Sequence, residues 1–175
     1  YYIHVVTDAD DAIYEHNAEH NNSGRSARLT LTARPATDLV LTNLTGAATG
    51  NSGQPTTLNW TVQNVGTIAT QATSWRDAAY LSIDAVLDIN SDTALGEWVH
   101  NGALAMDATY DRSAAPSLPN GVSGDYYLFL VVDSQTNVTD DNRANNVDYV
   151  TTPISITLSP SPDLLPTAIN PVATA

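Results

Sequence analysis

Two segments of this chain align without a gap at a spacing of 125 residues. YYIHVVTD at residue 1 matches YYLFLVVD at residue 126, and the register holds to the last residue, with 13 of 50 positions identical. A fixed period of this kind is typical of domain arrays. The spacing predicts three parts: the last strands of one repeat (residues 1–36), one complete repeat (37–160) and the first strand of the following repeat (161–175).

Short segments of alternating apolar and polar residues in the complete repeat predict β-strands. Ala79, Leu81 and Ile83, for example, share one face of such a segment. The seven expected strands cover residues 38–45, 56–64, 78–84, 95–100, 108–118, 124–132 and 145–158. Turn sequences such as Asn101-Gly102 separate them. The pattern predicts an all-β fold without helices, an immunoglobulin-like Greek-key β-sandwich of about seven strands, arranged in tandem array.

Three residues are expected to anchor the core of this sandwich: Trp60, Leu81 and Tyr127. Trp75 and Trp98 are expected to pack at its edges. A tryptophan that stacks on a carbohydrate is the functional alternative, but isolated tryptophans in sandwiches mostly serve as core residues.

The charge of the chain limits its partners. The net charge is −13, all six basic residues are arginines, and there is no cysteine. Nucleic acids and anionic membranes are therefore not expected as partners, and neither disulfides nor zinc–thiolate sites can form. No run of eighteen apolar residues predicts membrane insertion. So acidic a chain instead favours the binding of hard cations through carboxylates.

Three strings carry a resemblance to a known family: SGQPTTLNWTVQNVGTIAT, SWRDAAYLSIDAVLDINSDTALGEW and SGDYYLFLVVDSQTNVTDDNRANN. Together they resemble the cell-adhesion-related domain found in bacteria (CARDB), over the complete repeat and both fragments. The resemblance implies an immunoglobulin-like fold strung in tandem in large extracellular or cell-surface proteins of prokaryotes, with adhesive or spacer roles. It brings no catalytic residues, so the chain is not expected to be an enzyme.

Oxygen-bearing side chains in two loops are candidate ligands for calcium. The first loop offers Asp84, Asp88, Asn90 and Asp92 at alternating or nearby positions, but it lacks the turn glycine and the final glutamate of an EF-hand loop. A site there must borrow ligands, and the second acidic loop supplies Asp133, Asp140 and Asn142. The alternative is that these residues end strands and form turns.

The string His16-Asn17-Ala18-Glu19-His20 matches the H-x-x-E-H pattern of one class of zinc proteases. That pattern functions on a helix, where residues four apart share a face. Here it falls in a loop between strands, and the second copy of the repeat keeps neither histidine. A solvated loop is the expected role.

N-x-S/T sequences occur at Asn21, Asn43, Asn59 and Asn137, and those at Asn43 and Asn137 are the candidate glycosylation sites. Such matches also arise by chance in a chain rich in Asn and Thr. A glycosylating, extracellular setting would favour their use.

Two classes of function remain open from the sequence. The first is a structural or adhesive module of a stalk or extracellular filament, whose partners are neighbouring repeats or copies of the same protein. The alternative is a module that binds surface glycans or proteins, as an adhesin or as an accessory domain of an extracellular enzyme. Because the two end fragments would expose unpaired sandwich edges, we expect them to pair with neighbouring segments, by covalent continuation or by strand exchange.

Overall fold

The computed structural model describes residues 1–160 and 162–167, and the side chain of Glu19 is not described. The chain divides into two units, Tyr1–Arg34 (unit 1) and Pro35–Ala175 (unit 2). Residues 162–167 have no regular secondary structure. The opening strand predicted for a following repeat at 161–175 otherwise lies outside the described residues. No helix among the described residues is long and apolar enough to cross a membrane.

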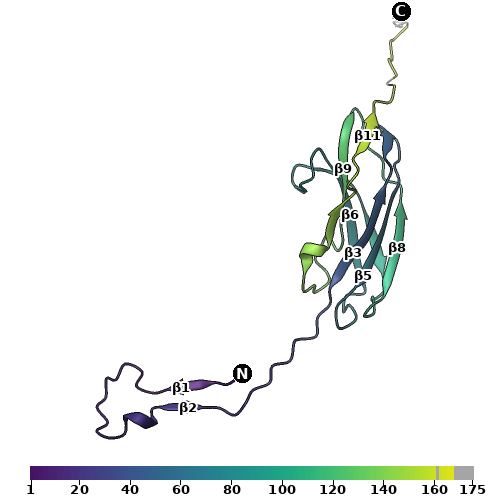
Figure 1. Cartoon of the computed structure of the whole chain (residues 1–175). Helices are drawn as coiled ribbons and strands as arrows, with labels where there is room; N and C mark the ends of the chain where they lie inside the picture. The colour runs from purple at the N-terminus through teal and green to yellow at the C-terminus, as the bar shows by residue number, and fades with distance from the viewer. Residues whose placement is uncertain (161, 168–175) are drawn as a thin grey trace, which may run out of the picture. The chain divides into compact units, whose positions relative to one another are not determined.

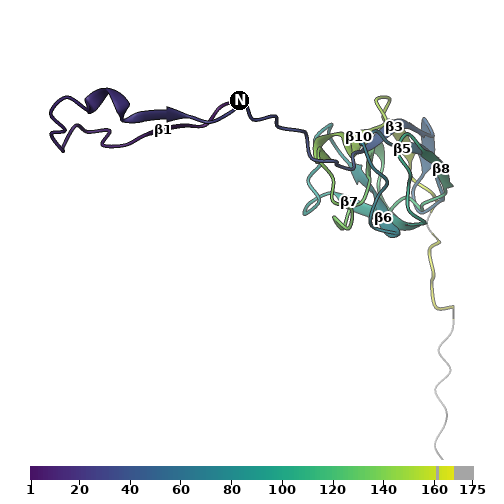
Figure 2. The same ribbon diagram turned by 90° about the horizontal axis from the view of Figure 1, so that it is seen from below.

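Unit 2 is a two-layered β-sandwich, which confirms the predicted immunoglobulin-like class (Figure 1). One sheet has the order β3–β5–β8, with bounds Leu39–Gly46, Leu58–Asn64 and Thr109–Ala114. The other has the order β4–β11–β9–β6–β7, with bounds Thr49–Asn51, Ile154–Thr157, Gly124–Val131, Ser74–Ser82 and Thr93–Asn101. A further short strand, β10 (Val147–Tyr149), also pairs with β9. Viewed from one end, β3, β5 and β8 lie across from β6 and β7 (Figure 2).

Alternation of side chains explains how each strand contributes to the core. In β5, Leu58, Trp60 and Val62 are buried while the residues between them are partly exposed. The inward positions of β6 are Trp75, Asp77, Ala79 and Leu81, all buried. This is the expected result for strands whose one face meets a second sheet.

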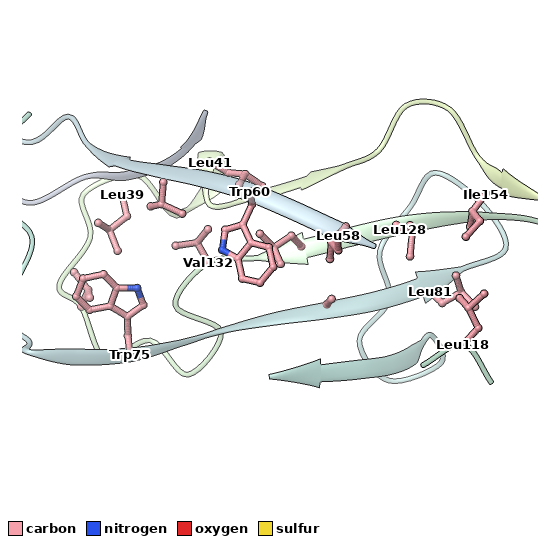
Figure 3. Packing of buried hydrophobic residues seen from close by; sticks show 14 of the residues in the cluster. Leu39, Leu41, Leu58, Trp60, Trp75, Leu81, Leu118, Leu128, Val132 and Ile154 are labelled. Carbon is pink, nitrogen blue, oxygen red and sulfur yellow. The ribbon is translucent and has the colours of Figure 1, made fainter. Parts of the chain in front are cut away.

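The core confirms the predicted positions of Trp60 and Leu81 (Figure 3). The prediction for Trp75 was wrong, because this side chain is fully buried in the same cluster. Trp98 is partly buried and packs against Trp60 with ring centroids 5.4 Å apart. The prediction for Tyr127 was also wrong: its ring lies outside the core cluster and packs against Tyr149 at 5.5 Å.

The strand boundaries differ from the predicted ones in several places. Unit 2 has nine strands among its described residues rather than seven, because β4 occupies part of a predicted turn and the last predicted strand is divided into β10 and β11. Ile83 is 75% exposed, because β6 ends at Ser82. The strand predicted at 108–118 is the shorter β8.

Unit 1 is a β-hairpin followed by an extended segment. Its strands β1 (His4–Val6) and β2 (Ser23–Arg25) are antiparallel, and a short 3-10 helix, η1 (Glu19–Asn21), precedes β2. Downstream of β2, the backbone amide of Leu29 donates to the carbonyl of Tyr1 at 2.8 Å. The apolar side chains of this unit are exposed, including Ile3, Val5, Ile13 and Leu31.

Candidate functional site

The two acidic loops proposed to supply calcium ligands lie at opposite ends of paired strands. One loop (residues 83–92) follows β6 and the other (132–146) follows β9. These strands are antiparallel, so that Ser82 pairs with Tyr127 whereas Ala78 pairs with Val131. The two pairs are four residues apart along each strand, which corresponds to about 13 Å. Ca²⁺ contacts its oxygens at about 2.3–2.6 Å, so a single ion cannot bridge both loops.

In the β6–β7 loop, the candidate ligands bind the backbone of their own loop. Asp84 Oδ1 accepts from the Val86 amide at 2.9 Å, and Asp92 Oδ2 accepts from the Asp88 amide at 2.7 Å. Asp88 Oδ1 accepts from the Asn90 amide at 3.0 Å. This bond and one from the Ser91 side chain hold the pKa of Asp88 below its usual value. Such bonds are typical of turn-forming residues.

Asp133 is the centre of the β9–β10 loop. Its φ of 48° is left-handed, and its two carboxylate oxygens accept from the amides of Asn137 and Val138, each at 2.9 Å. Arg143 Nη1 donates to Asp133 Oδ2 at 3.1 Å, and Arg143 Nη2 donates to the Asp133 carbonyl at 2.7 Å. The buried carboxylate therefore has a full set of protein donors and a counter-charge.

The end of the same loop fastens the start of β3. Asp140 Oδ2 accepts from the Leu39 amide and from Asn146 Nδ2, both at 3.0 Å, and Asp140 Oδ1 accepts from the Asn142 amide at 2.9 Å. Asn145 Nδ2 donates to Asp38 Oδ1 at 2.9 Å. Of the candidate calcium ligands, Asn142 thus donates its backbone amide to Asp140. Asp140 in turn joins the β9–β10 loop to the start of β3, which is distant in sequence.

Two amide oxygens in this region have no hydrogen-bond donor. Oδ1 of Asn145 and Oδ1 of Asn146 are buried and unpaired, although buried polar atoms normally have a partner. The Nδ2 atoms of the same two residues bind the carboxylates of Asp38 and Asp140, so the candidate ligands in this part of the loop are all oxygens, which suit a hard cation better than a transition metal. No group of three or more His, Cys, Asp or Glu that could hold a metal occurs among the described residues. Any cation here would therefore depend on the amide oxygens.

A buried carboxylate that the sequence interpretation missed lies in the middle of the sandwich. Asp77 is 0% exposed, and its Oδ2 accepts from Trp60 Nε1 at 2.9 Å and from the Tyr110 hydroxyl at 2.8 Å. Its Oδ1 accepts from the Asp133 amide at 3.3 Å. Trp75 Nε1 donates to the Tyr110 hydroxyl at 3.1 Å. Burial raises the pKa of Asp77 and, together with the nearby Asp77 charge, that of Tyr110.

This network joins the two sheets rather than facing solvent. Trp60 and Tyr110 belong to one sheet and Asp77 to the other, and Asp133 connects them to the β9–β10 loop. His100 stacks on Trp75 and lies tilted against Tyr110, each with ring centroids 4.1 Å apart, and burial lowers the pKa of His100. Since the Asp77 carboxylate is enclosed and already accepts three hydrogen bonds, its role is to hold the sheets together.

The remaining sequence candidates lie at the surface. Asn43 is exposed on β3 and Asn137 is exposed in the β9–β10 loop, so both glycosylation predictions concern accessible side chains. In the H-x-x-E-H string, His16 lies before η1, which starts at Glu19, and its φ of 58° is not helical. The two histidines therefore do not share a helix face. A hollow of about 280 Å³ lies on the β3–β5–β8 sheet, lined by side chains that include Asn43, Thr61 and Asp111.

Three solved structures that resemble this fold come from two organisms. The CARDB domain of a Pyrococcus furiosus protein, crystallised in complex with di-metal ions, is 17% identical with a TM-score of 0.52, covering 75% of this chain and 98% of its own. A solution structure of that domain also has a TM-score of 0.52 and 17% identity, covering 72% of this chain and 100% of its own. A domain of a candidate cell surface protein from Methanosarcina acetivorans is 18% identical, with a TM-score of 0.51. The match covers 70% of this chain and 93% of that domain.

Sequence comparison gives the assignment. No curated protein matches the chain. The CARDB family model, by contrast, matches residues 36–150, which is more than half of the chain and nearly all of the sandwich of unit 2. The chain therefore belongs to the CARDB family of non-catalytic modules.

Proposed function

We propose that this chain is a segment of a structural spacer in a cell-surface protein, built from CARDB domains joined end to end. The family and the relative from a candidate cell surface protein support a surface module. The finer proposal of an end-to-end array rests on how the chain passes through unit 2 and on what unit 1 contains.

The chain enters and leaves unit 2 at opposite ends of the sandwich (Figure 1). The start of β3, at Leu39, pairs with Asn64 at the end of β5, and the end of β3, at Gly46, pairs with Leu58. β4 follows β3 directly, and its last residue, Asn51, lies beside Thr157 at the end of β11. A domain with this path adds its full length to a row of similar domains, which is what a spacer requires.

Unit 1 reproduces the β9–β10 loop of unit 2, and this observation carries the proposal. Asp8 has a φ of 46°, and its carboxylate accepts from the amides of Ala12 and Ile13, each at 2.9 Å, as that of Asp133 does from Asn137 and Val138. The Tyr1–Leu29 contact likewise corresponds to the Tyr126–Ile154 pair of β9 and β11. The pairing of β2 differs from that of β10 by one residue. His4 pairs with Arg25, whose equivalent is Val150, whereas Phe129, the equivalent of His4, pairs with Tyr149.

The apolar residues of unit 1 are those that the sandwich of unit 2 buries. Ile3 is 56% exposed and its equivalent Leu128 only 1%, and Leu31 is 63% exposed against 3% for Ile156. Val5, Ile13 and Leu29 are likewise exposed, whereas their equivalents are buried. Exposed apolar strands of this kind are aggregation-prone unless they are covered. We therefore infer that unit 1 forms the last strands of a sandwich whose other strands resemble β3 to β8.

A two-domain chain tests this proposal. Residues 35–125 are placed directly before Tyr1, which recreates the junction between residue 125 and Tyr126. We expect amide hydrogen exchange at Val5 and Leu29 to slow to the level of Leu130 and Ile154, because the added strands cover the hairpin.

A matched control carries Leu58→Asp and Val62→Asp in the added segment only, which prevents that copy from forming a core. Val5 and Leu29 should then exchange as fast as in the original chain. Fast exchange at both residues in the unsubstituted two-domain chain would contradict the array proposal.

We place the proposed calcium site in the β9–β10 loop, at the end of the loop that is hydrogen-bonded to the start of β3. Its support is the pair of buried, unpaired oxygens of Asn145 and Asn146, whose Nδ2 atoms bind Asp38 and Asp140, together with the metal-bound relative. Ca²⁺ at millimolar concentration should raise the melting temperature of the chain above its value in EDTA, and Asn146→Leu should remove the difference. Identical melting curves in Ca²⁺ and EDTA would refute calcium binding.

A further inference from the structure

The first and last parts of the sandwich lie side by side. After β3, the chain crosses to the second sheet, where β4 pairs with β11 in parallel. Thr49 lies opposite Ser155, Gly50 opposite Ile156 and Asn51 opposite Thr157. β4, which continues directly from the first strand β3, and β11, the last strand of the sandwich, are thus hydrogen-bonded neighbours that run in the same direction.

Several hydrogen bonds connect these two segments. The Ser155 amide donates to the Ala48 carbonyl at 2.9 Å, and the Ser52 amide donates to the Thr157 carbonyl at 2.8 Å. Beyond the strands, Ser159 binds Ser52 twice: its amide donates to Ser52 Oγ at 3.0 Å, and its hydroxyl donates to the Ser52 carbonyl at 2.7 Å. Ser52 is buried, so water has little access to this pair of bonds.

The path of the chain determines how tension loads these bonds. Tension at the start of β3 pulls β4 back toward the end of the sandwich where the chain enters. Tension beyond Ser159 pulls β11 toward the opposite end. Because β4 and β11 are parallel neighbours, they are pulled past each other along their length, and all the bonds between them must yield together. Strands that are peeled apart from one end lose their bonds one at a time and separate under less force.

The end at which the chain enters is anchored as well. The Ala36 amide and carbonyl both bind Thr67, the second through the Thr67 amide at 2.8 Å, and the Val65 amide donates to the Asp38 carbonyl at 2.8 Å. The Asp141 amide donates to the Thr37 carbonyl at 2.9 Å. Residues 36–38, just before β3, are therefore hydrogen-bonded to neighbouring loops, and tension reaches β3 without first separating its initial residues from the sandwich.

We infer that unit 2 bears tensile load along the chain, with the β4–β11 pair and the Ser52–Ser159 bonds as a shear clamp. The inference rests on the spacer proposal for its biological use, but the resistance itself is a property of unit 2 alone. It assigns a mechanical function to a domain whose family membership specifies only a surface module.

Single-molecule pulling on the whole chain tests the clamp in two directions. The chain has no cysteine, so pairs of introduced cysteines define where the handles attach. Arg34→Cys with Pro160→Cys applies tension from end to end, whereas Ser123→Cys with Pro160→Cys peels β11 from β9, starting at the Gly124–Ile156 pair. At one pulling speed, the end-to-end pair should give the higher unfolding force, because forced unfolding follows the unfolding rate under load. An end-to-end force equal to or below the peeling force would overturn the inference.

A pair of matched variants locates the resistance. Ser52→Ala with Ser159→Ala removes both side-chain bonds of the clamp, and Thr61→Ala with Ser74→Ala removes two side-chain bonds elsewhere, to Asp111 and to the His100 carbonyl. The first pair should lower the end-to-end force and the second should not. Equal effects of the two pairs would contradict the clamp. Because neither experiment involves unit 1, failure here is distinct from failure of the array, which the exchange experiment reports.

Discussion

Asp77→Ala is expected to be the most informative single substitution in the core. The side chain is fully enclosed and accepts three hydrogen bonds, from Trp60, Tyr110 and the Asp133 amide. Alanine would leave all three donors buried without an acceptor. Each such donor costs about 1–3 kcal/mol, and removal of the buried charge offsets part of the total.

We therefore expect Asp77→Ala to lower the free energy of unfolding by about 3–5 kcal/mol. That is a large share of the roughly 5–15 kcal/mol that stabilises a typical domain, and it corresponds to a fall in melting temperature of roughly 10–20 °C. Urea unfolding followed by tryptophan fluorescence measures the loss, since Trp60 is itself a donor to Asp77.

The exposed residue Asp125 supplies the control. Asp125→Ala should change the free energy of unfolding by less than about 0.5 kcal/mol. If Asp77→Ala were no more destabilising than Asp125→Ala, the Asp77 network would not be what holds the two sheets together.

The pH dependence of Asp77→Asn gives an independent test of the same carboxylate. Burial raises the pKa of Asp77 above 3.8 in the folded state, so the folded chain binds this proton more tightly than the unfolded chain. The stability of the parent chain relative to Asp77→Asn should therefore be greatest below about pH 4 and fall as the pH rises through the folded-state pKa. A difference that rises with pH over this range would contradict the assignment.

Five further substitutions test individual contacts. Arg143→Met should lower the free energy of unfolding by about 2–3 kcal/mol, because it leaves the buried Asp133 carboxylate without its cation. Arg76→Met removes an exposed pair with Glu97 and should change the free energy of unfolding by less than about 1 kcal/mol. Equal losses in urea unfolding would contradict the role of Arg143 as the counter-charge of Asp133. Gly50→Ala should cost about 1–3 kcal/mol, because a Cβ would lie 2.6 Å from Leu118 Cδ1, and an unchanged melting temperature would show that this end of the core yields. Ile83→Ser should be neutral within about 0.5 kcal/mol and Leu81→Ala should cost about 2–5 kcal/mol, so similar thermal melts for the two would contradict the observed end of β6.

The alternating pattern predicted the strands well but not where they end or which way a uniform run faces. Leu81 and Ile83 have the same phase, yet β6 ends between them because its partner β7 starts at Thr93, opposite Leu81. In YYLFLVV every residue is apolar, so alternation cannot choose between the two tyrosines. The opposing sheet decides it: Tyr126 packs against the core cluster, while Tyr127 lies outside it.

The Asp77 network and the separation of the two acidic loops could not be predicted from the sequence, because both depend on how distant strands pair. Asp77 has the inward phase of Trp75 and Ala79, and this phase was the one signal in the sequence that could have identified it. Its partners Trp60 and Tyr110 are 17 and 33 residues away, on other strands. The two acidic loops both carry Asp and Asn at spacings that suit calcium ligands, but the antiparallel pairing of β6 and β9 places these loops at opposite ends of the two strands.

Electron microscopy of the intact parent protein tests most directly whether these domains form a row joined end to end. Averaging along the molecule should show a single line of similar domain-sized particles, since the chain enters and leaves unit 2 at opposite ends. Domains packed side by side into one compact particle would contradict the account.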